Sequence, residues 1–270
     1  EGIDVSIQPA KGSDLSTKLV GSRQDQFASA SAATTLIARS KGMPLKVLAI
    51  LHQTTPTSVF SLKTVPLNKP KDLEGKSLAS DPSSLKHNEF KVFCKLNKVD
   101  IEKIKILSIK GSDFIYLLNG NADSMLAFDY IGDALLRKKG HEVNEFRLAD
   151  YGVDIFGIGI ITHEDLIKEN PDLVKRFVRA SIKSWDYVVK NPEEAVDALV
   201  EAYPELKQQE MLDQIKLVIS HIQSEETKKN GLGYQSRDKW EKTQDLLYDQ
   251  ALIDKKIDLN EVYTNKFLPK

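Results

Sequence analysis

The sequence predicts an α/β protein built from two lobes, and three features of the chain support this fold class. Over residues 1–162, short β-branched and apolar runs alternate with stretches of helical periodicity. That alternation is typical of βα units around a mostly parallel sheet. Beyond residue 162 the strand signals almost stop and helix starts follow one another. Two interruptions, a proline- and lysine-rich segment at 64–75 and a glycine-broken run at 150–159, divide the chain.

The elements of the first 162 residues follow one another in a regular order. The runs with strand character are IDVSI, QFASA, LKVLAIL, SVFSL, KSLAS, IKILSI, SMLAF, EVNEF and GIGIIT. The helices expected among them cover residues 13–22, 31–41, 83–97, 112–119 and 131–139. Several strands hand over directly to a helix, as a βα repeat requires.

The C-terminal part is predicted to be helical. Two Asn-Pro pairs, at 170–171 and 191–192, mark helix starts. Asparagine caps a helix, proline suits its first position, and the acids that follow face the positive end of the helix dipole. Apolar residues between the pairs recur at three- and four-residue spacing and predict a buried helix face: Leu173, Phe177, Val178, Ile182, Trp185 and Val189. Further helices are expected over 193–202, 206–222 and 236–251.

The two interruptions predict a discontinuous architecture. A self-contained βα block lies between them, so one lobe is expected to comprise residues 1–72 and 158–270, and the other residues 73–157. The chain would then cross between the lobes twice, near 64–76 and near 150–160. Two connecting strands between two lobes form a hinge.

Composition excludes several classes of protein. A chain of 270 residues that is 41% hydrophobic can form a core, and its net charge of −1 argues against a nucleic-acid partner. No run approaches the ~18 apolar residues of a membrane span. One cysteine and five scattered histidines predict neither a disulfide nor a metal site. Because no phosphate loop, dinucleotide-binding or nucleophile-elbow motif occurs, we expect no catalytic residues and no cofactor.

The first residues carry no export signal, because they lack a basic region followed by an apolar one. Instead Ile3, Val5 and Ile7 alternate as in a strand. A chain that starts inside a strand indicates that an N-terminal βα unit is missing, and we expect one upstream.

Small polar residues are clustered at the connections where a helix follows a strand. In open α/β sheets, ligands lie beyond the carboxyl ends of the strands, where free N–H groups at helix starts bind polar groups. Five groups have this placement: Gly12-Ser13-Asp14, Ser29-Ala30-Ser31, Gln53-Thr54-Thr55, Ser80-Asp81-Pro82-Ser83-Ser84 and Asp129-Tyr130. Together they predict a polar binding site.

Motifs along nearly the whole chain resemble one family. They are EGIDV at 1–5, KGS at 11–13, ARSKGMPLKV at 38–47, NKPKDLEGKS at 68–77, LLNGNAD at 117–123, ADYGVDIFG at 149–157, NPDLVKRFVRA at 170–180 and NPEEAVD at 191–197. In these motifs the sequence resembles the NMT1/THI5-like periplasmic substrate-binding proteins. This group is related to carriers of thiamine pyrimidine precursors, riboflavin, sulfonates and nitrate.

The resemblance implies a two-lobed, type II periplasmic-binding-protein fold without enzymatic activity. Such a protein captures a small polar or heteroaromatic molecule between its lobes by hinge closure and delivers it to an ABC permease. It implies a periplasmic or extracellular protein, soluble or lipid-anchored, and monomeric. The residues that the resemblance assigns to ligand binding are Gly12, Ser13, Ser29, Ser31, Gln53, Ser83, Asp129, Tyr130 and Asp154.

Two alternatives stay open from the sequence. Eukaryotic relatives in the group synthesise a thiamine pyrimidine phosphate from a bound pyridoxal phosphate and a histidine, and they carry a cysteine-rich motif, whereas this chain has only Cys94. The second alternative is a sensory or effector module of a signalling protein, which would use the same lobes as a ligand switch.

The charges near the predicted site favour a neutral or weakly cationic ligand. The candidate positions include Asp14, Asp81, Asp129 and Asp154, with Lys11 as the only nearby base. A free carboxylate repels an anion and accepts hydrogen bonds from amino groups. An aminopyrimidine-like heterocycle is therefore expected ahead of a sulfonate or nitrate.

Overall fold

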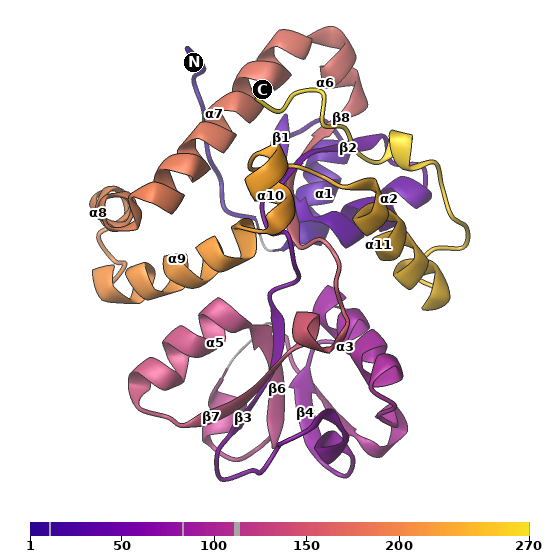
Figure 1. Ribbon diagram of the computed structural model, residues 1–270, viewed down its shortest axis with the longest axis vertical. Helices are drawn as coiled ribbons and strands as arrows, with labels where there is room; N and C mark the ends of the chain where they lie inside the picture. Colours follow the sequence, from indigo (N-terminus) through magenta and orange to yellow (C-terminus); the bar gives the residue numbers. More distant parts are fainter. Residues whose placement is uncertain (11, 83, 111–113, 270) are drawn as a thin grey trace. The chain divides into compact units, whose positions relative to one another are not determined.

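The computed structural model describes residues 1–10, 12–82, 84–110 and 114–269, and the chain divides into two compact units (Figure 1). The first unit comprises Glu1–Thr54, Ile155–Tyr203 and Ile219–Lys270. The second comprises Thr55–Asp154 and Pro204–Val218. The chain therefore changes unit after residues 54, 154, 203 and 218, the last of these inside helix α9 (Gln208–Ile222).

The second unit contains a five-stranded sheet in the order β5-β4-β6-β3-β7. Its strands are β3 (Thr57–Leu62), β4 (Ser77–Ser80), β5 (Lys105–Ser108), β6 (Ser124–Phe128) and β7 (Val143–Arg147). β4 runs parallel to both β5 and β6, whereas β3 runs antiparallel to β6 and β7. The helices of this unit are α3 (Leu85–Leu96), α4 (Ile115–Leu118) and α5 (Asp129–Leu135), with short 3₁₀ turns between elements.

Both faces of this sheet are covered. Phe60 and Met125 point to one face, where they pack with Phe114, Leu117 and other apolar residues of the α4 and α5 region. Successive residues of a strand point to opposite faces. Phe146 of β7 accordingly faces the other side and lies 6.4 Å from the ring of Phe93 in α3, centroid to centroid. The apolar alternation of the strand runs therefore produces a sheet buried on both sides.

The position of β3 corrects the predicted lobe boundary. Residues 1–72 were expected in one lobe, but β3 lies inside the second unit's sheet, so residues 55–72 were assigned to the wrong lobe. The Pro/Lys-rich segment at 64–75 is a connection between β3 and β4 of one sheet. Prolines and lysines mark a solvent-exposed turn, and they do not show whether the turn lies within a domain or between two. The segment 204–218 was not predicted in the second unit either.

The first unit contains a three-stranded sheet in the order β1-β8-β2. Its strands are β1 (Phe27–Ser31), β2 (Leu45–Ile50) and β8 (Ile158–His163), and β8 is antiparallel to both neighbours. A mostly parallel sheet was therefore the wrong expectation for this unit. β8 and β3 each run against the strands beside them, and a strand's apolar pattern does not encode its direction.

Helices surround this sheet, with bounds α1 (Ser13–Gly21), α2 (Ala32–Ser40), α6 (Glu164–Glu169), α7 (Pro171–Lys190), α8 (Pro192–Ala202), α10 (Glu225–Asn230) and α11 (Arg237–Asp249). The predicted stripe of α7 supplies core residues. Val178 and Ile182 pack with Leu48 of β2 and Ile160 of β8. None of the helices in the described residues is long and apolar enough to cross a membrane.

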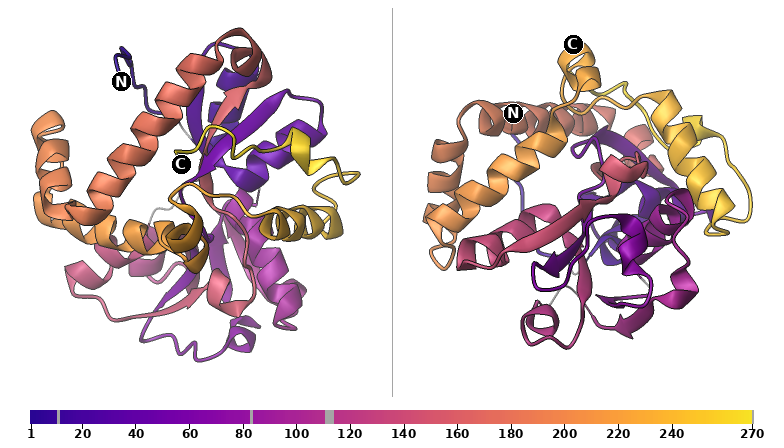
Figure 2. Two further views of the ribbon diagram at one scale, coloured as in Figure 1. Left: turned by 45° about the horizontal axis from the view of Figure 1, so that its top comes forward. Right: turned by 60° about the horizontal axis from the view of Figure 1, so that its bottom comes forward.

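The N-terminal segment differs from its prediction. Residues 1–10 form no strand, and Val5 and Ile7 are 51% and 81% exposed. The segment runs beside α7 in Figures 1 and 2, where Arg176 donates to the Glu1 carbonyl at 3.0 Å. Alternation of apolar residues gives a strand only where a neighbouring strand supplies hydrogen bonds. The expected helix at 112–119 is shorter, as α4, and residues 111–113 lie outside the described part of the chain.

Candidate functional site

The carboxyl ends of four strands share one edge of the second unit's sheet. β4, β5 and β6 are parallel, and β7 runs in the same direction because β6 and β7 are both antiparallel to β3. Their last residues are Ser80, Ser108, Phe128 and Arg147. Ligands of open α/β sheets bind at this kind of edge. We call it the carboxyl edge of the second unit.

Asp129 and Tyr130 open helix α5 directly after β6. Asp129 is 1% exposed, and its Oδ1 accepts the backbone N–H of Tyr130 at 2.7 Å. The Tyr130 ring stacks on Phe128 with centroids 5.6 Å apart and planes inclined by 29°. Burial, with the nearby Asp129 charge, raises the pKa of the Tyr130 phenol to about 12, so the phenol stays protonated at neutral pH. This corner presents a planar aromatic surface beside a buried carboxylate.

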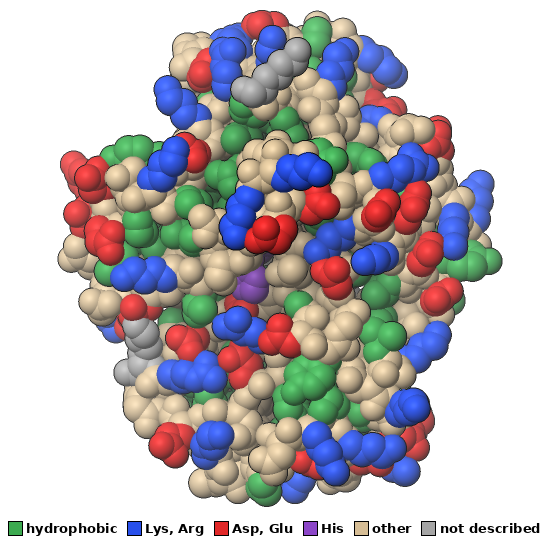
Figure 3. Space-filling model, in the orientation of Figure 1, with side chains coloured by type: hydrophobic (Ala, Val, Ile, Leu, Met, Phe, Trp, Pro, Cys, Tyr) green, Lys and Arg blue, Asp and Glu red, His purple; other side chains and the backbone are tan. Residues whose placement is uncertain are grey.

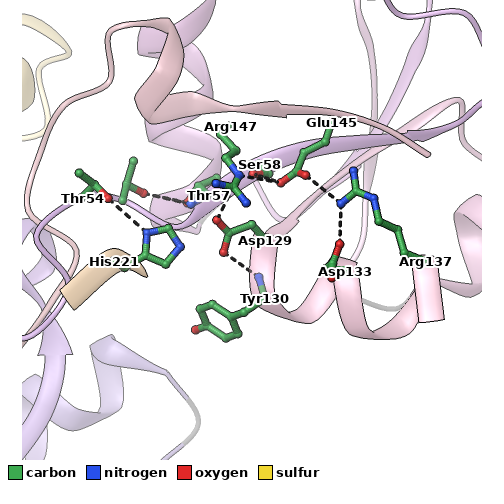
Figure 4. Close-up of polar contacts among 11 residues, drawn as sticks. Thr54, Thr57, Ser58, Asp129, Tyr130, Asp133, Arg137, Glu145, Arg147 and His221 are labelled. Carbon is green, nitrogen blue, oxygen red and sulfur yellow. Dashed lines mark hydrogen bonds and ion pairs between the residues drawn. The ribbon is translucent and has the colours of Figure 1, made fainter. Parts of the chain in front are cut away.

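Arg147 connects Asp129 to a second acid. Its Nε lies 3.7 Å from Asp129 Oδ2 and 3.5 Å from Glu145 Oε1 (Figure 4). Glu145 also accepts the Ser58 hydroxyl at 2.9 Å and the guanidinium of Arg137 at 3.1 Å. Figure 4 shows Arg147 between the two carboxylates at the end of its strand. The Asp129 carboxylate therefore has a cationic neighbour within its own unit.

Lys86, in the first turn of α3, is a second cation of this region. Its Nζ lies 4.9 Å from the centroid of the Phe128 ring, the same ring that stacks on Tyr130. Burial lowers the pKa of the Lys86 ammonium, while the negative charges of Glu89 and Asp81 oppose that shift. The prediction that Lys11 is the only nearby base was therefore wrong, because Lys86 and Arg147 also lie near this corner. Lys11 itself lies outside the described residues.

A buried acid follows one turn further along α3. Glu89 is 3% exposed, and its Oε2 accepts the hydroxyls of Thr55 at 2.8 Å and Thr57 at 2.5 Å. Burial raises the pKa of the Glu89 carboxyl, and the two hydroxyl donors partly offset this effect. Nearby, the Ser80 hydroxyl lies 2.7 Å from His87 Nδ1. The contacts of Glu89 fix the start of β3 to α3, and that of His87 fixes the end of β4 to α3.

The first unit has its own cluster at the carboxyl ends of its strands. Ser31 ends β1 and precedes α2, and its backbone N–H donates to the Ser13 hydroxyl at 3.0 Å. The Ser31 hydroxyl is buried and has no hydrogen-bond partner among the described residues. Two helix starts, those of α1 and α2, therefore meet here. The Ser31 hydroxyl and the N–H groups at these helix starts can donate hydrogen bonds, so an acceptor atom of a ligand would suit this position.

Residues 52–54 follow β2 at the same edge. The Gln53 amide donates to the carbonyls of Ile50 at 3.2 Å and Tyr234 at 3.1 Å. Thr54 Oγ1 lies 3.2 Å from His221 Nδ1, and the rings of His52 and His221 have centroids 5.8 Å apart. The Gln53 side chain therefore binds main-chain carbonyls of its own unit. Sequence reasoning missed the neighbouring pair of histidines, His52 and His221.

The predicted site residues fall into separate groups. Ser13 and Ser31 are brought together in the first unit, and Asp129 and Tyr130 are brought together in the second. The remaining predicted residues are placed as follows: Gly12, Ser29 and Asp154 are exposed, Gln53 is committed to main-chain contacts, and Ser83 lies outside the described residues.

Sequence reasoning missed Arg147, Lys86 and Glu89. Each of them meets its partner only through the tertiary fold. The one local signal was the position of Lys86 in the first turn of an expected helix.

One hollow adjoins the Arg147 cluster, and another lies apart from the clusters described above. One of about 890 Å³ follows β7 and is lined by Lys63, Arg137, Glu145, Arg147 and Tyr151, among others. One of about 420 Å³ lies in the first unit, between Lys46 and the C-terminal segment 260–267. Basic and acidic side chains are interspersed on the face that Figure 3 shows. In the part of the chain that the structure describes, no group of histidine, cysteine, aspartate or glutamate residues is placed to hold a metal ion.

Both the fold and the sequence identify the class of this protein. The NMT1/THI5-like family model matches residues 1–195, and the chain belongs to that family. Its fold is that of the periplasmic binding proteins. The aliphatic sulfonate-binding protein SsuA of Escherichia coli superimposes with a TM-score of 0.74 at 13% identity, over 93% of this chain and 79% of that one.

Relatives whose sequences are more similar to this chain are named for other ligands or for an enzyme. The riboflavin-binding protein RibY of Chloroflexus aurantiacus is 27% identical over 90% of this chain and 70% of its own length. The formylaminopyrimidine-binding protein of Halalkalibacterium halodurans is 24% identical over 74% of this chain, which spans 61% of that protein. A 4-amino-5-hydroxymethyl-2-methylpyrimidine phosphate synthase of Legionella pneumophila is 26% identical over 97% of this chain and 81% of its own length.

Proposed function

We propose that this protein is the solute-binding component of an ABC importer and that its ligand is a small, planar, polar heterocycle. The observation that carries the ligand class is the corner formed by Phe128, Asp129 and Tyr130. Stacked aromatic rings suit a flat ligand, and a buried carboxylate accepts hydrogen bonds from ring amino or imino groups. An aminopyrimidine has both features.

The relatives support the same class of ligand. One is named for riboflavin and another for a formylaminopyrimidine, and both molecules contain a planar nitrogen heterocycle. The first unit adds donors at the starts of α1 and α2, which suit a ligand oxygen or ring nitrogen. Our proposal includes hinge closure of the two units on the ligand, delivery to a membrane permease, and a periplasmic or extracellular location.

A panel of ligands tests this proposal. Thermal unfolding is followed with riboflavin, 4-amino-5-hydroxymethyl-2-methylpyrimidine, taurine and nitrate, each in excess. A ligand at 100 times its Kd stabilises a protein by about 2.7 kcal/mol. The proposal predicts an increase in Tm with a heterocycle and a smaller one or none with the two anions. Small-angle X-ray scattering with the stabilising ligand tests closure, which predicts a smaller radius of gyration.

A second candidate function is pyrimidine phosphate synthesis, because the synthase of Legionella pneumophila aligns with nearly the whole chain. The single cysteine weighs against it, since Cys94 is buried and burial raises the pKa of its thiol to about 12. Such a thiol is not a nucleophile at neutral pH. Incubation of the protein with pyridoxal phosphate and analysis for the pyrimidine phosphate separates the two functions.

A further inference from the structure

The Asp129 carboxylate is almost fully buried at the carboxyl edge of the second unit, where the proposed function requires a ligand contact. A buried carboxylate is costly unless a hydrogen bond or an opposite charge compensates it. Asp129 has both, because Oδ1 accepts the Tyr130 N–H at 2.7 Å and Oδ2 lies 3.7 Å from Arg147 Nε. Its charge is therefore not the isolated negative charge that the sequence suggested.

Arg147 is held at this edge by strand pairing with β3 and by an ion pair with Glu145. It is the last residue of β7 and is paired in register with Ser58 of β3. Its Nε lies 3.5 Å from Glu145 Oε1, and Glu145 is in turn fixed by Ser58 and Arg137. The Arg147 side chain is still 40% exposed. A ligand group that approaches Asp129 from solvent therefore also meets a guanidinium.

We propose that Arg147 is a specificity-determining residue, which neutralises Asp129 so that the edge accepts an uncharged heterocycle and disfavours a cationic one. The inference rests on the proposed function and narrows its ligand class. Like charges close together repel, and an interaction change of about 1.4 kcal/mol alters an equilibrium constant tenfold. The sequence prediction allowed a weakly cationic ligand, and the Asp129–Arg147 contact removes that option.

Two matched pyrimidines test the proposal. The probes are 4-amino-5-hydroxymethyl-2-methylpyrimidine, which is uncharged at pH 8, and its 5-aminomethyl analogue, which carries an ammonium group. Isothermal titration calorimetry gives both Kd values for wild type and for Arg147→Gln. We expect the variant to shift the ratio of the two Kd values about tenfold toward the cation. The control Lys105→Gln removes the same charge from the same unit, at the start of β5, and should shift the ratio less than twofold.

Two further variants separate charge from structural damage. Arg147→Lys keeps the cation and should keep the wild-type ratio. The double variant Arg147→Gln/Asp129→Asn removes both charges and should lose the gain in cation binding that the single variant shows. An unchanged Kd ratio in a folded Arg147→Gln protein would overturn the proposal. So would a shift of the same size in the control variant Lys105→Gln. Should Arg147→Gln not fold, the double variant decides, since failure to restore folding would contradict the pairing.

The same titrations distinguish this inference from the proposed function. Wild-type protein that binds the uncharged pyrimidine, with a ratio insensitive to Arg147, refutes the inference and leaves the function standing. Wild-type protein that binds neither pyrimidine refutes the aminopyrimidine ligand. The thermal unfolding midpoints of Arg147→Gln, of a single Asp129→Asn variant and of the double variant then decide whether Arg147 compensates Asp129. If the loss of Tm in the double variant equals the sum of the losses in the single variants, the conclusion that Arg147 compensates Asp129 is also wrong.

Discussion

The ring of Phe60 occupies the space in which a side chain at Gly132 would lie. A Cβ atom built on Gly132 would be only 2.3 Å from Phe60 Cζ, and Phe60 is fully buried in β3. Helix α5 can therefore approach the sheet closely only because residue 132 has no side chain. This close packing positions the start of α5, where Asp129 and Tyr130 lie.

We expect Gly132→Ala to destabilise the protein by about 1–3 kcal/mol, which is typical of an overpacked core. Chemical denaturation of the purified variant measures the loss. Adding Phe60→Leu in the same chain makes room for the new methyl group and should recover part of the stability. A Gly132→Ala protein as stable as wild type would show that α5 does not pack on Phe60 in this way.

Tyr130→Ala should weaken binding of a heterocyclic ligand, because it removes one ring of the stacked pair. Aromatic stacking contributes about 0.5–1.5 kcal/mol, so the Kd should rise roughly two- to thirteenfold by calorimetry. Tyr187→Ala is the matched control, since Tyr187 is 49% exposed on α7 of the first unit. Equal affinity of the two variants would limit Tyr130 to a packing role.

Glu89→Gln should stabilise the protein at neutral pH relative to wild type. Burial raises the pKa of Glu89 in the folded state above its value of 4.5, and hydrogen bonds from Thr57 and Thr55 partly offset this. The folded state therefore binds the proton more tightly than the unfolded state, and stability falls as pH rises above 4.5 toward the raised pKa. Glutamine stays neutral throughout, so its advantage should grow between pH 4.5 and pH 7.5 in denaturation curves.

Asp123→Asn, also in the second unit, should change the pH dependence of stability in the opposite direction to Glu89→Gln. Partial burial would raise the pKa of Asp123, but hydrogen bonds from the backbone and side chain of Ser77 lower it overall. Its contribution to stability is present at neutral pH and lost in acid, so this substitution should cost more at pH 7 than at pH 3. The same pH dependence in both variants would show that Glu89 is not buried as described.

Cys94 should be inert in the folded protein. It is buried in α3, and burial raises the pKa of its thiol to about 12. A thiol-specific chromogenic disulfide should modify it only as fast as the protein unfolds, and completely in denaturant. Rapid modification of native protein at pH 7 would instead reopen a catalytic role for this residue.

The elements that local patterns predict well are those with short-range causes. The strand runs around Val47 and Leu126 and the α7 face at Val178 follow from apolar periodicity, which the chain itself carries. Strand direction and lobe membership depend on long-range pairing, and so β3 was assigned to the wrong lobe and β8 was not expected to be antiparallel. A loop rich in proline looks the same within a domain as between two.

The candidate site shows the same division. The placement of Ser31 at the end of β1 and of Asp129 directly after β6 could be predicted, because it is a local property of the sequence. Arg147 could not, since Asp129 lies 18 positions before it in the sequence and meets it only in the folded sheet, although Glu145 is two residues away on the same strand. Ser29 also has the predicted placement in sequence but is exposed in β1. That Ser13, Ser29 or Ser31, Ser83 and Asp129 face one shared cleft stays a prediction.

The most direct test of this account is calorimetric titration of the wild-type protein with 4-amino-5-hydroxymethyl-2-methylpyrimidine and with taurine under identical conditions. The account predicts saturable one-to-one binding of the pyrimidine, at least tenfold tighter than that of taurine, a difference of about 1.4 kcal/mol. Tighter binding of taurine, or binding of neither, would contradict it.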